Sequence, residues 1–328
     1  MAGEVRGLAL MSGGLDSILA VRVLMEQGVP VTAIHFTTPF SPSAPAQARQ
    51  LAGAAGVVLL ERPYGAELIA AVLDPQHAKG RHLNPCIDCK IGMFRKAGEI
   101  MGAEGYGFLV TGEVLGQRPL SQHMRALMLI EREAGLERLV LRPLSAGLLP
   151  PTIPEERGWV DRARLLSVEG RTRKAQFALA EKFGIKDPPT PAGGCLLTDP
   201  GYTRRLSDAM RGGLVLDGHL AEVLQHGRLY RMEGAARLVV GRNQADNEAL
   251  AGLKLPTEHL LCPLSGRGPT ALALTGFPAE FLPAAASVVA RYTDREGDGP
   301  VEVQVDGGEA GSRVLAAAPA IPGGAVLV

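Results

Sequence analysis

Apolar residues gather in short runs that alternate with longer amphipathic stretches over the first two hundred positions. Residues 7–11 form one apolar run, which predicts a buried strand, and the apolar positions within 18–26 have helical spacing. Gly28 supplies a helix stop, and a second apolar run follows at 31–36. Strand, helix and strand in this order predict the β-α-β unit of a parallel sheet.

The same alternation continues further along the chain. It predicts helices over 47–55, 66–73 and 90–101, and strands over 57–61 and 107–111. A doubly wound α/β fold is therefore expected, in which ligands bind outside the carboxyl ends of the strands. The loop at 12–17, the end of the second strand and the loop that opens at Thr111 all belong to that edge, where they can form one site.

The length of the chain, 328 residues, favours two domains. Residues 187–191 read Asp-Pro-Pro-Thr-Pro, a rigid extended stretch, and a glycine turn at 192–195 follows it. Beyond about residue 210 arginine becomes frequent and lysine rare. We therefore expect a nucleotide-binding domain over 1–210 and a smaller α+β domain over 211–328, with a boundary fixed to within about ten residues.

The segment 12–17, with sequence Ser-Gly-Gly-Leu-Asp-Ser, lies between the first predicted strand and helix. Glycine permits a close backbone approach, and the N–H groups at the helix start can point at a phosphate. Asp16 would repel phosphates unless it binds Mg²⁺ or handles a proton, so the segment indicates nucleotide chemistry. The predicted phosphate contacts are Ser12, Gly13, Gly14 and Ser17, with Asp16 beside them.

This segment matches neither of two common phosphate loops, because the chain has no G-x-x-x-x-G-K-[ST] and no G-x-G-x-x-G followed by a suitably placed acid. Its pattern resembles the PP-loop of N-type ATP pyrophosphatases. That resemblance implies cleavage of ATP between the α and β phosphates, while AMP is attached to a substrate oxygen. An ordinary capped glycine turn is the structural alternative.

Two further segments of the ligand edge carry candidate contacts. The adenosine is expected along the end of the second strand, against Ile34, His35 and Phe36, although a lone histidine there is more often a packed side chain. The loop 111–122 offers Gly112 and polar side chains. Gln117, Arg118, Ser121 and Gln122 are candidates for ATP or substrate contact, and a satisfied turn is the alternative.

Net charge and targeting signals narrow the class of protein. The formal net charge is zero, so a nucleic-acid partner has to be argued from local basic patches. No signal peptide is visible, and no apolar run reaches the ~20 residues of a membrane span, so we expect a cytoplasmic protein without a membrane partner.

The chain has four cysteines, and in a reducing compartment they indicate metal or sulfur chemistry. Cys86 and Cys89 lie at the predicted start of a helix, where the helix dipole lowers a thiol pKa. With Cys195 they could hold a 4Fe-4S cluster with one open iron, or with His82 a zinc ion. One of them could instead carry a persulfide, and simple reduced thiols are the structural alternative. Cys262 is expected to be structural.

Separated motifs then occur in one order: residues 12–17, the loop 111–122, and Leu-Arg-Pro-Leu at 141–144. Over about residues 6–210 the chain resembles the catalytic domain of the ThiI family of tRNA 4-thiouridine synthases. The resemblance implies adenylation of a uracil carbonyl in tRNA and displacement of AMP by sulfur. The three cysteines are similar to those of PP-loop thiolases that bind a 4Fe-4S cluster. The family's THUMP and rhodanese domains have no counterpart here, so we expect different tRNA-docking and sulfur-delivery devices.

Residues 238–250 resemble part of the NFACT-R type of RNA-binding domain. A basic cluster at 171–176 could meet tRNA phosphate or the ATP tail, whereas the acidic stretch 294–309 should lie away from RNA. Scattered arginines on a solvated face are the alternative. The arginines expected near RNA phosphates are Arg204, Arg205, Arg211, Arg228, Arg231, Arg237 and Arg242.

The sequence therefore predicts ATP-dependent thiolation of a tRNA uridine, with ATP and Mg²⁺ as cofactors and either a 4Fe-4S cluster, zinc or a persulfide. The expected partners are tRNA and a sulfur donor, either sulfide or a persulfide carrier such as a cysteine desulfurase; a homodimer is also compatible. Both 2-thio and 4-thio products stay open. A PP-loop sulfurtransferase or ligase for a small molecule, and an RNA-binding adaptor with a vestigial ATP site, are the alternatives. The catalytic candidates are Asp16, Cys86, Cys89 and Cys195.

Overall fold

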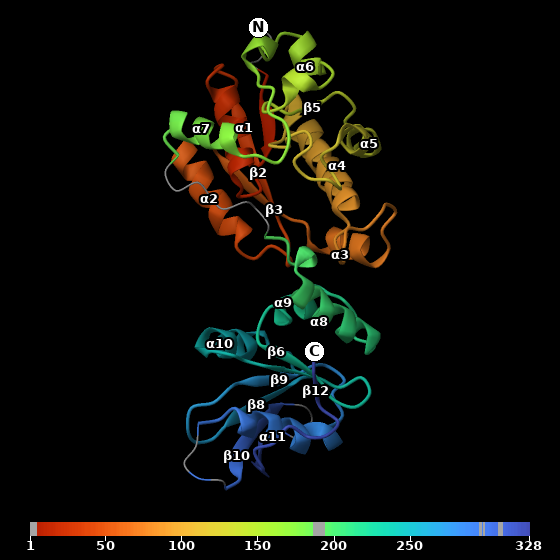
Figure 1. Ribbon diagram of the computed structural model, residues 1–328, viewed down its shortest axis with the longest axis vertical. Coiled ribbons are helices and arrows are strands. Elements are labelled where there is room, and N and C mark those ends of the chain that lie inside the picture. The colour runs from red at the N-terminus through yellow and green to blue at the C-terminus, as the bar shows by residue number, and fades with distance from the viewer. Residues whose placement is uncertain (1–4, 186–193, 295–296, 298, 308–310) are drawn as a thin grey trace. The chain divides into compact units, whose positions relative to one another are not determined.

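The computed structural model describes residues 5–185, 194–294, 297, 299–307 and 311–328 (Figure 1). The chain divides into two compact units, Met1–Thr198 and Asp199–Val328. Helix α8 (Pro200–Arg211) thus falls in the second unit, whereas the expected boundary of 210 would have placed it in the first. The extended stretch predicted at 187–191, and residues 192 and 193 of the glycine turn, lie outside the described residues.

The first unit contains a five-stranded parallel sheet in the order β3-β2-β1-β4-β5. This order confirms the doubly wound α/β fold, here of the PP-loop-like type. The strands are β1 (Gly7–Leu10), β2 (Val31–Thr37), β3 (Leu59–Pro63), β4 (Phe108–Val110) and β5 (Val140–Leu141).

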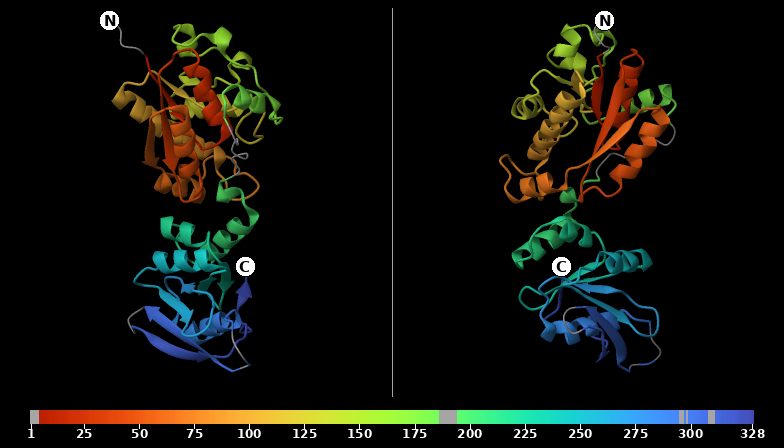
Figure 2. Two further views of the ribbon diagram at one scale, coloured as in Figure 1. Left: turned by 90° about the vertical axis from the view of Figure 1, so that its left-hand side faces the viewer. Right: turned by 180° about the vertical axis from the view of Figure 1, so that it is seen from behind.

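Helices cover both faces of this sheet (Figures 1 and 2). Helix α1 packs against α2 and α7, whereas α4 packs against α3 and α5. Three short 3₁₀ helices lie at 146–148, 162–164 and 196–198. The α-helices are α1 (Leu15–Met25), α2 (Ala44–Ala55), α3 (Gly65–Leu73), α4 (Cys86–Glu104), α5 (Met124–Ala134), α6 (Ile153–Glu156) and α7 (Lys174–Lys182).

The chain leaves β1 toward β2 on one side of the sheet, and the later strands β4 and β5 lie on the other side. Ligands of such sheets bind at this switch point, beyond the carboxyl ends of β1 and β4. The two loops meet there: a Cβ on Gly112 would lie 2.4 Å from the carbonyl carbon of Asp16 and 2.5 Å from the nitrogen of Ser17. Only a residue without a side chain allows the two backbones to come this close.

The second unit is built on a seven-stranded antiparallel sheet in the order β11-β10-β8-β9-β7-β6-β12, so the expected second α+β domain is confirmed. Helix α11 packs on β8, β10 and β11 over an apolar core. The strands are β6 (Arg228–Arg231), β7 (Arg237–Val240), β8 (His259–Pro263), β9 (Ala271–Ala273), β10 (Val301–Gly307), β11 (Arg313–Ala317) and β12 (Val326–Leu327). Besides α8, the helices are α9 (Gly218–Val223), α10 (Gln244–Leu253), α11 (Leu282–Arg291) and a 3₁₀ turn at 279–281.

Within the described parts of both units, no helix has the length and apolar character needed to cross a membrane.

The contact at Gly112 can be tested with two alanine substitutions. Gly112→Ala should destabilise the protein by about 1–3 kcal/mol or more and weaken ATP binding, because the new methyl group collides with the backbone of α1. Gly102→Ala is the matched control: its Cβ meets no atom within 4 Å, and alanine favours the helix by about 0.5–1 kcal/mol. Urea unfolding and nucleotide titration measure both effects, and equal stability of the two variants would contradict the contact.

Candidate functional site

The phosphate loop connects β1 to α1, as the sequence predicts. Gly13 has a φ of +81°, in the left-handed region, and a Cβ there would lie 3.0 Å from both the Ala44 carbonyl oxygen and Gln47 Cβ. Gly14 is extended and forms the N-cap of α1. The first N–H groups of α1 therefore open onto this loop, which is the geometry of an anion site.

The two serines of the loop are held by the backbone around them. The hydroxyl of Ser17 is buried and donates to the Gly14 carbonyl oxygen at 2.7 Å, while Ser12 Oγ accepts from the Gly14 N–H at 3.4 Å. Ser17 thus fixes the shape of the loop. Contact of either serine with phosphate stays a prediction.

Asp16 and Gln117, predicted separately, come together in the fold. The Gln117 Nε2 donates to Asp16 Oδ2 at 3.0 Å, while Asp16 Oδ1 is buried and has no hydrogen-bond partner among the described residues. A carboxylate oxygen in this position suits the Mg²⁺ that accompanies a nucleotide. The fit supports the assignment of Asp16 to cation or phosphate chemistry, which stays a prediction.

His35 lies at the end of β2 and ties that strand to the phosphate loop. Its Nδ1 lies 2.7 Å from the Met11 carbonyl oxygen; because a carbonyl only accepts, Nδ1 donates. The Nε2 atom is buried and has no hydrogen-bond partner among the described residues. Phe36 is buried too, with its ring centroid 5.8 Å from that of Tyr64. Contact of His35 or Phe36 with adenosine stays a prediction.

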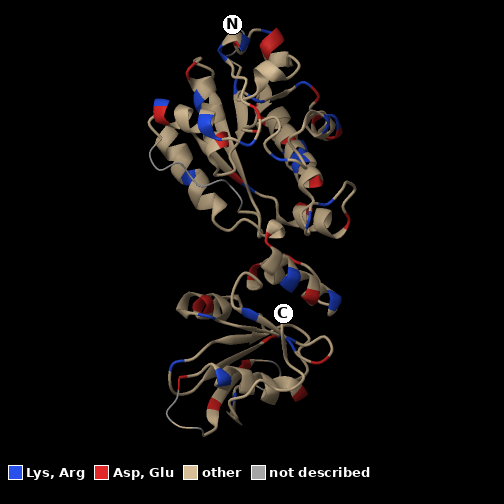
Figure 3. Cartoon of the chain, viewed as in Figure 1, with Lys and Arg blue, Asp and Glu red and all other residues tan. Residues whose placement is uncertain are grey.

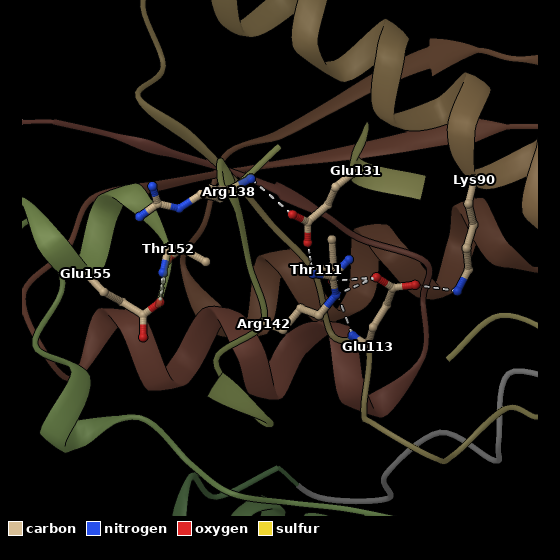
Figure 4. A network of polar contacts seen from close by, with 8 residues as sticks. All are labelled: Lys90, Thr111, Glu113, Glu131, Arg138, Arg142, Thr152 and Glu155. Carbon is tan, nitrogen blue, oxygen red and sulfur yellow. Dashed lines mark hydrogen bonds and ion pairs between the residues drawn. The ribbon is translucent and has the colours of Figure 1, made fainter. Parts of the chain in front are cut away.

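A buried ionic network lies directly behind the loop after β4 (Figure 4). Glu113 accepts from Lys90 through one carboxylate oxygen and from Arg142 Nε through the other, the latter at 2.9 Å. Arg142, 2% exposed, also donates to Glu131 of α5. We refer to these four charges, Lys90, Glu113, Arg142 and Glu131, as the ionic network. It links α4, the loop 111–122 (the ligand loop), the end of β5 and α5.

The pairing fixes the protonation state of its members. Burial by itself raises the pKa of Glu113, but the charges of Lys90 and Arg142 outweigh it and hold that pKa at about 2. Burial lowers the pKa of Arg142, and Glu113 and Glu131 more than compensate, so the pKa is raised. Glu113 and Arg142 thus stay charged near neutral pH, and each pairs with the charge it needs in a low-dielectric site.

The ionic network was not foreseen from sequence, although two of its members lie within motifs that were singled out. The signal that could have found it is Arg142, a charged residue inside the apolar stretch 140–144. An arginine at such a position is buried only if carboxylates pair with it.

The cysteines lie on two separate segments at the carboxyl edge of the parallel sheet. Cys86 is the first residue of α4, and its sulfur accepts from Asn84 Nδ2 at 3.3 Å. Cys89 follows one turn later and directly precedes Lys90 of the ionic network. Cys195 is positioned by its neighbour Leu196, whose N–H donates to the Phe40 carbonyl oxygen in the loop after β2 at 2.8 Å.

Burial controls the pKa values of Cys195 and Cys89, and the nearby Cys86 contributes to both. Burial raises the pKa of Cys195 to about 11, and Cys86 raises it as well. Burial also raises the pKa of Cys89, with further contributions from Cys195 and Cys86. The expectation that the helix start would lower the thiol pKa is therefore wrong for Cys89, because desolvation outweighs the helix dipole there.

The donor set does not fit a metal centre as it stands. Over the described ranges, no three or more histidine, cysteine, aspartate or glutamate side chains converge as metal ligands. Cys86 is close enough to Cys89 and Cys195 to raise their pKa values, but the three thiols do not form the ligand set of a cluster, and His82 does not complete a zinc site with them. We derive no step of the reaction through iron or zinc.

Basic and acidic residues are interspersed in both units (Figure 3). One expected RNA contact is wrong: Arg237 is 3% exposed and its Nε lies 2.7 Å from Asp208 Oδ1, so it braces the fold and cannot reach phosphate. Arg231 also pairs with Asp208, and Arg242 pairs with Asp246 at 2.8 Å. The contacts expected of the other arginines stay predictions.

A parallel sheet with a glycine phosphate loop after β1 defines an α/β protein of the PP-loop type. Residues 2–147 match the family model described as "Thiamine biosynthesis protein (ThiI)". Residues 227–322 match the model of the "NFACT protein RNA binding domain". One part of the chain thus matches the ThiI family model and another part matches the NFACT RNA-binding model, so both resemblances are confirmed.

Named relatives match parts of the chain. A "Probable tRNA sulfurtransferase" of Aeropyrum pernix is 31% identical over 194 residues, which are 58% of this chain and 45% of the relative. A protein of the same name from Methanosarcina mazei is 34% identical over 119 residues, 34% of this chain and 28% of the relative. The chain spans less than half the length of these curated relatives.

Among solved structures, a 4-thiouridine synthetase–RNA complex with bound ATP has a TM-score of 0.37 and 23% identity. The match covers 57% of this chain and 47% of that one. We base no argument on a likeness of this degree.

The ionic network yields a stability prediction. Glu113→Gln should lower the free energy of unfolding by about 3–5 kcal/mol, because it leaves Lys90 and Arg142 short of a buried counter-charge. Glu156→Gln is the matched control: it removes a carboxylate from an ion pair with Arg138 whose two side chains are half exposed, which should cost less than about 1 kcal/mol. Chemical denaturation of both variants measures the difference.

The same substitution should change the dependence of stability on pH. Because folding lowers the pKa of Glu113 from 4.5 to about 2, its contribution is complete above pH 4.5 and is lost as the pH falls toward 2. The stability difference between wild type and Glu113→Gln should therefore shrink across this window. A difference that stays constant from pH 5 to pH 2 would show that Glu113 is not held ionised by its partners.

Proposed function

We propose that this protein catalyses ATP-dependent thiolation of a uridine in tRNA. The observation that carries the proposal is that one sheet edge holds both an ATP-type phosphate loop and a group of three thiols, joined through Lys90 and Glu113. The names of the curated relatives and the NFACT-R domain support tRNA as the substrate.

The phosphate loop performs the activating half of this reaction. The uracil carbonyl oxygen attacks the α-phosphorus of ATP, a new P–O bond forms, and pyrophosphate leaves with the electrons of the broken bond. Gly13, Gly14 and the N-terminus of α1 offer N–H groups to the pyrophosphate charge, which is stabilised most where water is excluded. Asp16, which has one carboxylate oxygen without a hydrogen-bond partner among the described residues, would hold Mg²⁺, and the cation would supply charge neutralisation for the phosphates.

The thiols perform the sulfur half. The terminal sulfur of a cysteine persulfide adds to the carbon that carries the AMP group, and AMP then leaves with its oxygen. A second cysteine thiolate attacks the inner sulfur of the resulting C–S–S–Cys link, so that the S–S bond breaks, the uridine keeps the terminal sulfur, and a cysteine disulfide forms that an external thiol reduces before the next turnover. We infer that a persulfide on Cys86, Cys89 or Cys195 carries this sulfur, since the three side chains do not converge as metal ligands. The 4Fe-4S cluster expected from sequence is the alternative that experiment can distinguish.

The test of the function is mass spectrometry of tRNA nucleosides from cells that lack this protein. A thiolated uridine should disappear and return with the wild-type gene but not with Asp16→Asn or Cys195→Ser. Cys262→Ser in β8 of the second unit is the matched cysteine control and should restore the nucleoside fully.

Two results would overturn the proposed function. Intact thiolated nucleosides in the deletion strain would favour a small-molecule substrate. Failure of the purified protein to form AMP and pyrophosphate with bulk tRNA would favour an RNA-binding adaptor.

The sulfur carrier is tested on protein purified without oxygen and treated with a persulfide donor, such as a cysteine desulfurase with its cysteine substrate. Peptide mass spectrometry should find one extra sulfur atom on a peptide containing Cys86, Cys89 or Cys195. Iron and acid-labile sulfide are measured on the same sample. If the protein contains about four iron atoms per chain and the triple serine variant loses them, the sulfur carrier is a 4Fe-4S cluster and not a persulfide.

A further inference from the structure

An exposed aromatic side chain lies on α7 with an arginine stacked over it. Phe177 is 49% exposed, although full burial of a phenylalanine contributes about 1.5–3 kcal/mol to stability. The guanidinium carbon of Arg173 lies 5.1 Å from the centroid of its ring. The pair forms a flat cationic and aromatic surface that the fold itself does not bury.

Helix α7 packs against α1, the helix that begins at the phosphate loop. Helices α1 and α7 pack together, and their ends match: Arg22 lies over the Phe183 ring at 5.4 Å, and Lys182 pairs with Glu26 at 2.8 Å. These contacts place the carboxyl-terminal ends of α1 and α7 side by side.

A backbone hydrogen bond places the segment that leads into α7 at the candidate site. The N–H of Gly170 donates to the Leu115 carbonyl oxygen at 2.8 Å, so the residues that lead into α7 lie against the ligand loop that carries Gln117.

The start of α7 is also suited to an anion. Three basic residues precede or open the helix: Arg171, Arg173 and Lys174. The first turn contains no acidic residue to balance them. Cations at a helix N-terminus are unfavourable because they oppose the helix dipole. Arg171 is exposed and makes no hydrogen bond or ion pair with the described residues. In the same turn Gln176 is fully buried, and neither atom of its amide has a partner among the described residues. A bound anion would compensate the unfavourable charge.

We propose that Arg171, Arg173 and Phe177 form a platform for an unpaired RNA nucleotide next to the uridine that enters the site. The inference rests on the proposed function. A uridine that reaches the part-buried Asp16 has to leave the base stack, and its neighbour then loses a stacking partner. Phe177 with Arg173 replaces that partner, and Arg171 binds the adjacent phosphate, which is how proteins hold single-stranded RNA.

The experiment compares Phe177→Ala and Arg173→Ala with the wild type in tRNA-dependent AMP formation. The KM for tRNA should rise about 5- to 150-fold, the loss that one stacked base represents, while the KM for ATP stays unchanged. Phe177→Trp should retain the wild-type KM for tRNA, because it preserves the stacking surface.

Two exposed residues provide matched controls. Val58→Ala removes a side chain that is 67% exposed just before β3, at the amino edge of the sheet, and Arg132→Ala removes a guanidinium from the last turn of α5. Both should leave the KM for tRNA within about twofold of wild type, as expected of surface substitutions.

A second assay separates the platform from the proposed reaction. Wild type and Phe177→Ala are titrated with fluorescent oligouridylate and with polyglutamate in the absence of ATP. If Phe177→Ala loses affinity for oligouridylate but not for polyglutamate, the platform is supported even when no thiolation is observed. Absence of thiolation would overturn only the proposed function. Unchanged KM and RNA affinity in Phe177→Ala, or equal loss of both polyanions, would overturn the platform.

Discussion

The fold of the candidate site depends on the ion pairs around Glu113. This carboxylate lies three residues beyond the end of β4, and its two oxygens bind a lysine of α4 and an arginine at the end of β5. Removal of one member would leave a buried charge without its partner, which is among the most costly changes a protein can undergo. The helix that carries Cys86 and Cys89 is thereby held against the ligand loop that reaches Asp16 through Gln117.

The phosphate loop and the parallel sheet were predictable because their signals are local. A glycine pair between a strand and a helix, and the periodicity of apolar residues, depend on neighbouring positions alone. The ionic network could not be predicted in this way, since its members come from four separate segments and none has a partner nearby in sequence. Only Arg142, a charged residue within an apolar run, indicated that buried carboxylates had to pair with it.

For the thiols and the arginines, the sequence predicted the position along the chain but not the burial or the partner of the side chain. The position of Cys89 at a helix start was correctly foreseen, but its pKa depends on burial, which is set by residues distant in sequence. Arg237 was expected to face RNA because it belongs to an arginine-rich segment, yet Asp208 of α8 holds it inside the second unit. Sequence placed these residues on their elements, and tertiary packing decided their chemistry.

The ionic network contains two cations and two anions, so their charges cancel. It therefore contributes little net field at the mouth of the site, and buried pairs are hardly screened by salt. Attraction of a polyanion depends instead on exposed side chains such as Arg171, whose field falls off over about 8 Å at physiological ionic strength. A higher ionic strength thus weakens capture of the substrate while the buried ion pairs of the site stay formed. Surface substitutions can therefore change substrate capture without changing the assembly of the site.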